Sequence, residues 1–183
     1  MFTGIVQAVG RIVRLDPLEI DCAALGVADI AVGDSIAVQG VCLTVTSLTG
    51  KGFTADVSAE TLRLTAGLDR PGEVNLEKSL KLGGEIGGHL VTGHVDGVGE
   101  VVSREGGVVQ VKLPKELARF VARKGSICVD GVSLTVNQAA GDTFEVNLIP
   151  HTLEVTTLGR LKKGSRVNLE VDLIARYVER MLK

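Results

Sequence analysis

The chain contains an internal repeat, and this repeat constrains the fold more than any other feature. The hexapeptide GVCLTV at residues 40–45 recurs as GVSLTV at residues 131–136, with a single residue changed. Further matches follow in the same order, with length differences confined to the segments between them. The aligned pairs are TGIVQAVGRIV (3–13) with TGHVDGVGEVV (92–102), GDSIAVQGVCLTV (33–45) with KGSICVDGVSLTV (124–136), ETLRLT (60–65) with HTLEVT (151–156), and VNLE (74–77) with VNLE (167–170). The sequence therefore predicts two copies of one structural unit.

Each copy has the pattern of short antiparallel strands. Apolar and polar residues alternate along 41–45, and glycines punctuate the chain at short intervals. The composition agrees, because 23 glycines and many aliphatic residues accompany only four Phe and one Tyr. Short strands with open edges invite aggregation, so closure into a barrel is the simplest arrangement. We expect an all-β protein with two tandem barrels, over residues 1–87 and 88–172.

Two segments have a helical pattern. Residues 114–123 begin with proline at a first-turn position, and Gly125 follows their end. The tail, residues 173–183, follows Asp172, which can act as an N-cap, and has no counterpart in the first copy. Its apolar stripe consists of Ile174, Tyr177, Val178 and Met181. An isolated helix of this length is marginal in water, so we expect the stripe to pack against other subunits.

Charge and composition exclude several classes of function. The formal net charge is −2, from 20 basic and 22 acidic residues, and no basic run suggests binding to nucleic acid or an anionic membrane. The N-terminus lacks an export signal, and the apolar stretches are too short to span a bilayer. The three cysteines form no C-x-x-C pair, so neither a disulfide framework nor a thiolate metal site is expected. We expect a cytoplasmic protein.

The sequence lacks common catalytic signatures. It has no phosphate-binding loop, no H-E-x-x-H zinc motif and no G-x-S-x-G elbow. The glycine-rich GGEIGG at 83–88 fits a flexible link between the barrels better than a dinucleotide site. Of the two neighbouring histidines, His89 is expected to be structural. For His94 the sequence leaves two alternatives, a substrate contact or an ordinary hydrogen-bonded residue at the rim of the barrel. Cys42 and Ser133 occupy equivalent positions, either as small strand residues or as the polar groups of two homologous pockets.

Several segments together resemble the riboflavin synthase family of the α-subunit type, across essentially the whole chain. They are MFTGIV, GVCLTV, DGVSLTV, ETLRLT, GGHLVTGHVDGVGEV and IPHTLEVTTLG. The resemblance implies two six-stranded Greek-key barrels with a C-terminal helix, assembled as a homotrimer. It also implies a transferase that needs no cofactor or metal. The active site is expected between the first barrel of one subunit and the second barrel of its neighbour.

The reaction implied by the resemblance is the last step of riboflavin biosynthesis. Two molecules of 6,7-dimethyl-8-ribityllumazine dismutate by transfer of a four-carbon unit, which gives riboflavin and 5-amino-6-ribitylaminouracil. Two identical substrates require two related but inequivalent pockets, which accounts for the duplication. Association with lumazine synthase is a further possible partnership. The alternative is a carrier like lumazine protein, which binds the same class of ligand without turnover.

The resemblance also assigns site residues. For catalysis, our own hypothesis places Cys42 and Ser133 near the reacting carbons, His94 in proton transfer, and Phe2 with Thr3 holding the N-terminus over a pocket. Asp130 is expected to orient Ser133. The first pocket is expected to contain Gly4, Ile5, Val6, Cys42, Leu43, Thr44, Asp56, Val57, Ser58, Ala59, Glu60 and Thr61. The second is expected to contain Gly93, His94, Val95, Lys124, Ser133, Leu134, Thr135, Asn147, Leu148, Ile149, Pro150, His151 and Thr152.

Overall fold

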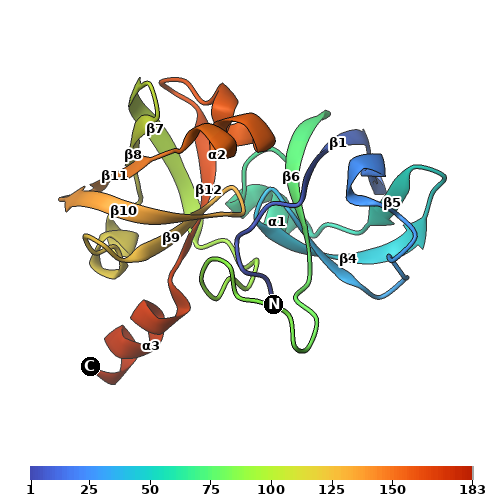
Figure 1. Ribbon diagram of the computed structural model, residues 1–183, viewed down its shortest axis with the longest axis horizontal. Helices are drawn as coiled ribbons and strands as arrows, with labels where there is room; N and C mark the ends of the chain where they lie inside the picture. Colours follow the sequence, from blue (N-terminus) through green and yellow to red (C-terminus); the bar gives the residue numbers. More distant parts are fainter. Residues whose placement is uncertain (183) are drawn as a thin grey trace.

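The computed structural model describes residues 1–182 and contains two closed barrels. They lie side by side, with the N-terminus between them and one helix projecting from the second barrel (Figure 1). The first barrel has the strands β1 (Ala8–Leu15), β2 (Leu18–Asp21), β3 (Ser35–Val38), β4 (Val41–Leu48), β5 (Gly52–Ala55) and β6 (Gly72–Lys78). The second has β7 (Gly97–Glu105), β8 (Val108–Lys112), β9 (Ser126–Val129), β10 (Val132–Ala140), β11 (Thr143–Asn147) and β12 (Arg166–Val171).

The two barrels share one topology. The first closes in the order β1-β2-β5-β4-β3-β6, and the second repeats it with each strand replaced by its partner six strands later. All strand pairs are antiparallel. The long strands β4 and β10 carry irregularities at matching places, after Val45 and after Val136, where an extra residue bends the strand. The prediction of two homologous six-stranded barrels is confirmed.

Each barrel has its own apolar core. Phe53 is fully buried at the centre of the first core, and its repeat equivalent Phe144 is buried at the centre of the second. The alternation seen in the sequence explains this, because every second residue of a strand points inward. Aliphatic side chains fill the remaining volume, which is why so few aromatic residues suffice.

Short helices connect the strands. The tail helix is confirmed as α3 (Leu173–Met181), and the Asp172 side chain accepts a 2.9 Å hydrogen bond from the Ile174 amide. The helix predicted over 114–123 is a shorter 3-10 helix, η2 (Lys115–Phe120). The sequence did not predict the others, because six residues or fewer give no clear helical periodicity. These are η1 (Ala23–Leu25), α1 (Ala59–Leu64), α2 (Pro150–Val155) and η3 (Thr157–Arg160).

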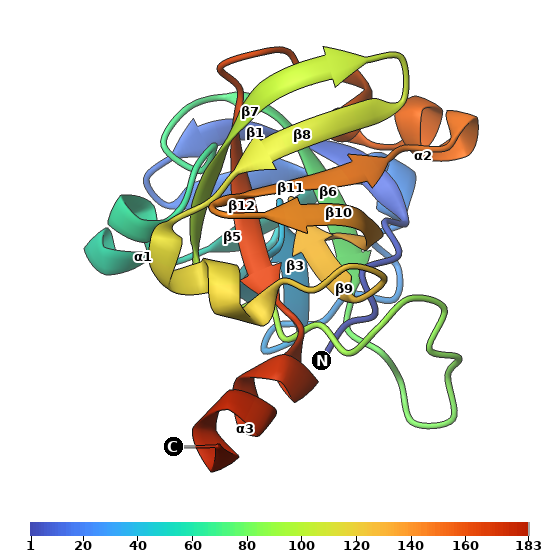
Figure 2. The ribbon, with the colours of Figure 1, turned by 90° about the vertical axis from the view of Figure 1, so that its left-hand side faces the viewer.

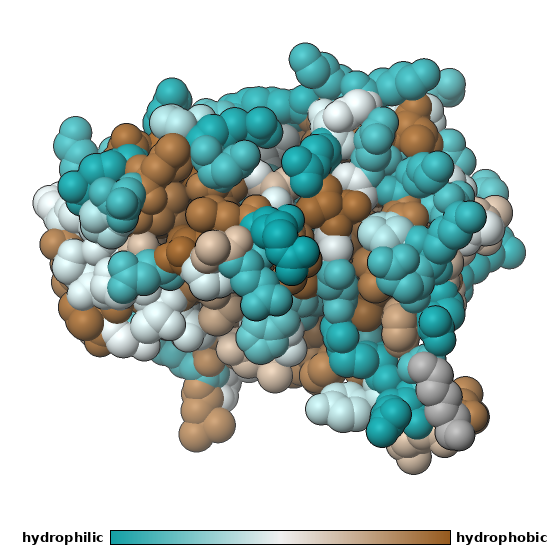
Figure 3. All heavy atoms as spheres, turned by 180° about the vertical axis from the view of Figure 1, so that it is seen from behind, coloured by the Kyte–Doolittle hydropathy of each residue, from teal (hydrophilic) through white to brown (hydrophobic). Residues whose placement is uncertain are grey.

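The tail helix stands away from the barrels. Figure 2, in which the second barrel faces the viewer, shows α3 leaving the lower end of that barrel. The view from behind shows hydrophobic atoms at the surface of α3 (Figure 3). The apolar side chains of this helix are exposed: Ile174 by 64%, Tyr177 by 63%, Val178 by 49% and Met181 by 84%. None of the helices within residues 1–182 has the length and apolar character that crossing a bilayer requires.

The barrels meet through two equivalent hairpin turns. The turn at Gln39 and Gly40 joins β3 to β4, and the turn at Asp130 and Gly131 joins β9 to β10; all four residues have positive φ. Side-chain amides bridge the turns in both directions, since Asn75 Nδ2 donates to the Asp130 carbonyl (2.8 Å). Asn168 Nδ2 donates to the Gln39 carbonyl (2.9 Å). The interface therefore has an approximate twofold relationship that follows the sequence repeat.

Candidate functional sites at the boundary between the barrels

The N-terminal segment lies against the second barrel although the first barrel holds it. Oε1 of Glu77, on β6, accepts hydrogen bonds from the Thr3 amide (2.8 Å) and hydroxyl (3.2 Å), and Oε2 accepts from the Gly4 amide (3.0 Å). The Gly4 carbonyl accepts a 2.7 Å hydrogen bond from the amide of Ser133 on β10. Val6 packs against the core of the second barrel.

The segment that enters the second barrel makes the reciprocal contacts. Oε1 of Glu170, on β12, accepts hydrogen bonds from the Thr92 amide (2.6 Å) and hydroxyl (2.7 Å), and Oε2 accepts from the Gly93 amide (2.9 Å). The Gly93 carbonyl accepts a 2.8 Å hydrogen bond from the amide of Cys42 on β4. Val95 packs against the core of the first barrel. The two segments thus cross between the barrels. We call the contact of residues 3–6 with the second barrel the first crossing, and the contact of residues 92–95 with the first barrel the second crossing.

Glycine is required at both crossings. Gly4 has φ +75°, and a Cβ there would lie 2.7 Å from the Cβ of Ser133. Gly93 has φ +78°, and a Cβ there would lie 2.6 Å from the Cβ of Cys42. Contacts this short do not occur between real side chains, and positive φ strains residues with a Cβ. The absence of a side chain at each glycine lets the backbone lie directly on the strand that carries the thiol or hydroxyl.

The expected grouping of the site residues is wrong in one respect. We expected residues 4–6 to share a pocket with Cys42, and residues 93–95 to share a pocket with Ser133. The structure places each segment on the opposite barrel, so residues 4–6 meet Ser133 and residues 93–95 meet Cys42. A sequence repeat shows which segments are equivalent, but it does not show onto which copy a segment docks.

The hydroxyl of Ser133 is hydrogen-bonded to His89, which was expected to be a structural residue. Nδ1 of His89 lies 2.7 Å from Oγ of Ser133, and the His89 amide donates to the Thr3 carbonyl (3.1 Å). Within the described residues, the buried Nε2 of His89 has no hydrogen-bond partner. Burial lowers the pKa of His89, against a smaller opposing effect of the Asp172 charge. The ring is therefore neutral at neutral pH, as a proton acceptor must be.

His94 belongs to the other crossing. Its amide lies 3.3 Å from the Thr92 hydroxyl, and its exposed ring follows directly after Gly93, which contacts Cys42. His94 is therefore placed with the thiol of the first barrel, not with Ser133. His89 has no equivalent in the first copy, since the repeat begins at Thr92 in the second copy and Thr3 in the first. The two crossings thus differ in chemistry as well as sharing a backbone arrangement.

Cys42 is the accessible thiol of the chain. It is half-buried, whereas Cys22 and Cys128 are buried and burial raises the pKa of both thiols. Cys42 packs against a small cluster that contains Phe2, whose side chain is 0% exposed. Phe2 also pairs with Val91 through two backbone hydrogen bonds of 2.7 and 3.1 Å. Phe2 therefore anchors the N-terminus inside the barrel interface, and its ring is shielded from any ligand.

The expected role of Asp130 is wrong. Its carboxylate accepts a 2.7 Å hydrogen bond from the Asn168 amide at the barrel interface, whereas the Ser133 hydroxyl is bonded to His89. Asp130 is 3% exposed, and burial raises its pKa to about 7, against hydrogen bonds from Asn168 and Gln39 that lower it. Asp130 is therefore a component of the interface, because the hairpin turn directs its side chain away from Ser133.

Other expected residues form the surroundings of the two crossings. Around Cys42, the side chain of Leu43 is buried in the first core and Val57 packs against it, while Ser58 caps α1. The remaining members are at the surface or half-exposed; they are Ile5, Thr44, Asp56, Ala59, Glu60 and Thr61. Of these residues, Ile5 alone lies on the side of Ser133, because residues 4–6 dock onto the second barrel. Asp56 and Val57 also border a 260 Å³ cavity at the end of the first barrel.

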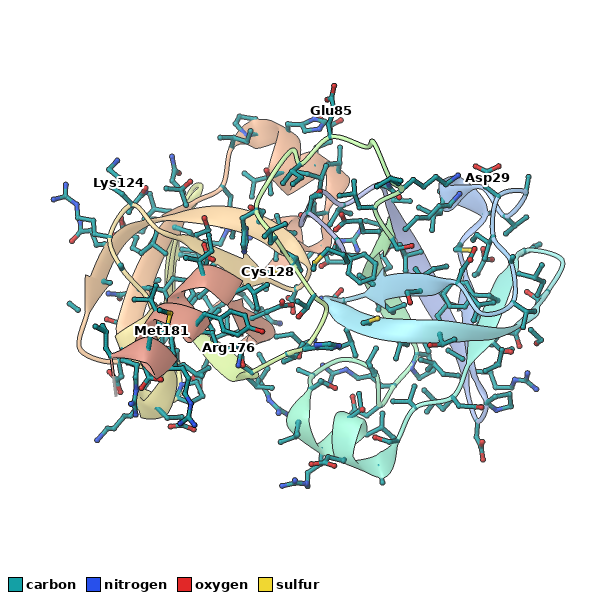
Figure 4. All side chains as sticks on the ribbon, turned by 90° about the horizontal axis from the view of Figure 1, so that it is seen from below. Asp29, Glu85, Lys124, Cys128, Arg176 and Met181 are labelled. Carbon is teal, nitrogen blue, oxygen red and sulfur yellow. The ribbon has the colours of Figure 1, made fainter. Side chains whose placement is uncertain are left out.

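The second barrel has a matching set. The side chain of Leu148 is buried in the core, and the half-buried side chain of Leu134 packs against the same core. Thr135, Asn147, Ile149, Pro150 and His151 are exposed, and Thr152 is half-buried. Lys124 is exposed on the outer face of the second barrel, whereas Cys128 lies near the boundary between barrels (Figure 4). Lys124 and Arg123 border a 560 Å³ surface cavity.

A further cavity of 570 Å³ adjoins the first crossing. Its wall includes Thr3, Ile5 and Glu77 on one side and Glu85 and Gly87 of the connecting segment on the other. Glu85 is at the exposed edge of this segment in Figure 4. The polar groups of the crossing are therefore next to open space large enough for part of a heterocyclic ligand.

The fold and these crossings define a class of protein with two related, inequivalent sites in one chain. The family model of the lumazine binding domain matches the chain twice, over residues 3–79 and 92–172. Riboflavin synthase of Mycobacterium tuberculosis is 51% identical, covering 100% of this chain and 98% of that protein. Riboflavin synthases of Photobacterium phosphoreum (44%, covering 100% and 89%) and Bacillus subtilis (41%, covering 100% and 90%) are also similar.

Solved structures agree with this result. A crystal structure of LumP complexed with 6,7-dimethyl-8-(1'-D-ribityl)lumazine superimposes with a TM-score of 0.80 and 28% identity. The complex of LumP with riboflavin gives a TM-score of 0.83 at the same identity. Each match covers 93% of this chain and 99% of the other. The chain belongs to the lumazine-binding-domain family, within the group of riboflavin synthases.

Proposed function

We propose that the chain is a riboflavin synthase, a transferase that dismutates two molecules of 6,7-dimethyl-8-ribityllumazine into riboflavin and 5-amino-6-ribitylaminouracil. The main observation in support is the pair of crossings, which are alike in backbone geometry but differ in chemistry. One contains Cys42, whose amide donates to the carbonyl of Gly93, the residue before His94, and the other contains the Ser133 hydroxyl bonded to His89. Donor and acceptor molecules need such a pair of related but unequal pockets.

The first task of the enzyme is to position the two substrates. Their reacting carbons must meet in one orientation, and positioning alone can supply roughly 7–11 kcal/mol of the barrier. The backbone carbonyls and amides of both crossings, together with Thr44 and Thr135 on equivalent strands, offer partners for the amide-like edge of the heterocycle. No residue is required to carry the four-carbon unit covalently in this arrangement.

The second task is proton transfer from the C7 methyl group of the donor. A neutral His89 accepts this proton, directly or through the Ser133 hydroxyl at 2.7 Å, and the resulting imidazolium later returns it. This role replaces the one expected for His94. At the other crossing, the proposal gives the Cys42 thiol the role of contacting or adding to the electrophilic C7 carbon of the acceptor.

Assembly is the third part of the proposal. Ile5 is 47% exposed and Ile149 is 57% exposed on the side of the Ser133 crossing, so a single chain leaves this pocket open. A homotrimer associated through the exposed stripe of α3 would place the first barrel of one subunit against the second barrel of the next. The limits 1–87, 88–172 and 173–183, the cytoplasmic location and an association with lumazine synthase stay predictions.

A turnover assay separates the proposed enzyme from a carrier. The purified protein is incubated with 6,7-dimethyl-8-ribityllumazine, and riboflavin is followed by its absorption and fluorescence. We expect one riboflavin for two lumazines consumed, with the uracil as the second product. A lumazine spectrum that shifts on binding but never converts would instead identify a carrier.

A further inference from the structure

Two buried carboxylates, Glu77 and Glu170, occupy equivalent positions in the repeated VNLE segments. Glu77 is 5% exposed and Glu170 is 3% exposed. Each accepts three hydrogen bonds from two consecutive residues of the segment that crosses to the other barrel, namely Thr3 and Gly4 or Thr92 and Gly93. Neither glutamate belongs to the site residues expected from the sequence, although both end the repeated VNLE segments.

Burial of a carboxylate is costly, and both side chains bear this cost. Burial raises the pKa of Glu77 and of Glu170, and the hydrogen bonds from the crossing segments oppose the rise. A buried charge persists where the surrounding donors satisfy it. The donors here are backbone amides that lie outside the barrel strands and would otherwise lack acceptors in the interface. Each carboxylate therefore substitutes for the sheet partner that a crossing segment lacks.

The hydrogen bonds of each glutamate continue directly to the opposite barrel. Glu77 holds the amide of Gly4, and the carbonyl of the same residue accepts the Ser133 amide. The neighbouring Thr3 carbonyl accepts the His89 amide, so Glu77 also fixes the segment to which that histidine is anchored. Correspondingly, Glu170 holds the amide of Gly93, whose carbonyl accepts the Cys42 amide.

We propose that Glu77 and Glu170 are positioning residues that act across the boundary, each on the pocket of the barrel to which it does not belong. Glu77 of the first barrel sets the geometry of the pocket with Ser133 and His89. Glu170 of the second barrel sets the geometry of the pocket with Cys42. The effect on catalysis rests on the proposed function, whereas the crossed geometry can be tested without a substrate.

The experiment compares Glu77→Gln with Glu170→Gln, a matched pair that keeps side-chain shape but removes the charge and one acceptor oxygen. Glu105→Gln, at an exposed position at the end of β7, serves as control. Hydrogen exchange of the Ser133 and Cys42 amides, followed by NMR on the full chain, reports each crossing separately. Loss of a charge-assisted hydrogen bond corresponds to a rate change of roughly tenfold or more.

The expected pattern is crossed. Glu77→Gln should speed exchange of the Ser133 amide roughly tenfold and leave Cys42 near the control, and Glu170→Gln should do the reverse. Alkylation of Cys42 by iodoacetamide, read by mass spectrometry, should likewise rise in Glu170→Gln and not in Glu77→Gln. Equal effects of both variants on both amides, or effects confined to the barrel that carries the mutation, would overturn the proposal.

Folding and function are controlled separately. If either glutamine variant fails to fold, Thr3→Val and Thr92→Val remove one donor to the same carboxylates and should give the same crossed pattern at smaller amplitude. In the turnover assay, the glutamine variants should lower kcat/KM while Glu105→Gln does not. A crossed exchange pattern in a protein that makes no riboflavin would refute the proposed function alone, and an uncrossed pattern in an active enzyme would refute this proposal alone.

Discussion

Gly40 and Gly131 face each other where the hairpin turns of the two barrels meet. A Cβ on Gly40 would lie 2.6 Å from the backbone nitrogen of Gly131, and a Cβ on Gly131 would lie 2.9 Å from the nitrogen of Gly40. The interface is thus built from backbone in contact with backbone. The side-chain amides of Asn75 and Asn168 then bridge the same two turns.

This contact predicts the effect of adding one methyl group. Gly40→Ala must both keep a positive φ of +81° and push the turns apart. Gly141→Ala is the matched control, because Gly141 has φ +59° with nothing within 4 Å of its Cβ position. The control should lose about 1 kcal/mol of unfolding free energy in urea. Gly40→Ala should lose clearly more, and equal losses would show that the close contact contributes nothing.

Asp130 predicts a dependence of stability on pH. Its pKa is about 7 in the folded protein against 3.8 in the unfolded chain, so the folded state binds the proton more tightly. Its contribution is therefore fully present below pH 4 and is lost as pH rises through 7. The pKa rises from 3.8 to about 7, and one unit of pKa difference corresponds to about 1.4 kcal/mol, so the total is on the order of 4 kcal/mol.

The test of this dependence is Asp130→Asn, whose amide oxygen can still accept from the Asn168 backbone. The variant should gain free energy of unfolding over the parent at pH 8 and have a flatter pH profile in urea titrations. Asp69→Asn, at an exposed carboxylate, should follow the parent. Parallel pH profiles for Asp130→Asn and the parent would contradict the assignment.

The proton-transfer assignment predicts unequal effects of the two histidines. His89→Gln should lower kcat on the order of 10²–10⁴-fold, because it removes the group that accepts the donor proton. His94→Gln should have a smaller effect on kcat. The parent should lose activity as pH falls below 6.5, since the lowered pKa of His89 places its protonation there. A larger loss in His94→Gln than in His89→Gln, at equal ligand affinity, would reverse the assignment.

The tail helix predicts a change of assembly. Nη2 of Arg176 on α3 donates hydrogen bonds to both carboxylate oxygens of Asp96 (2.6 and 2.8 Å), which fixes the helix to the second barrel, and Figure 4 shows this residue on the helix. The apolar stripe remains outward. Met181→Asp should therefore lower the oligomeric state in sedimentation without lowering the melting temperature of the barrels. If neither Met181→Asp nor deletion of residues 173–183 changes the oligomeric state, other surfaces hold the subunits together.

The repeat made the barrels predictable. Alternation and glycine spacing indicate strands, and duplication of GVCLTV requires that both halves share a topology. The N-cap at Asp172 and the apolar stripe of the tail helix could also be predicted from the sequence, because local chemistry determines both. The helices α1 and α2 could not be predicted, since six residues give too little periodicity.

The crossed docking of the segments was beyond sequence reasoning. Residues 4–6 and 93–95 are equivalent by alignment, but only three-dimensional contact shows that each lies on the other barrel. His89 was expected to be structural, and its hydrogen bond to Ser133 depends on three-dimensional contacts that the sequence does not show. The segment around it is irregular, with one isolated bridge at Val91. Asp130, three residues before Ser133, was expected to orient that side chain, but its carboxylate accepts a hydrogen bond from the Asn168 amide at the barrel interface.

A crystal structure with riboflavin tests the central claim most directly, because the product of the proposed reaction should occupy the same pockets as the substrates. The account predicts two flavins per chain, one in contact with both Cys42 and residues 93–95 and the other in contact with both Ser133 and residues 4–6. Each flavin would thus contact elements of both barrels. Flavins that contact residues of one barrel only, or that avoid Cys42 and Ser133 altogether, would contradict it.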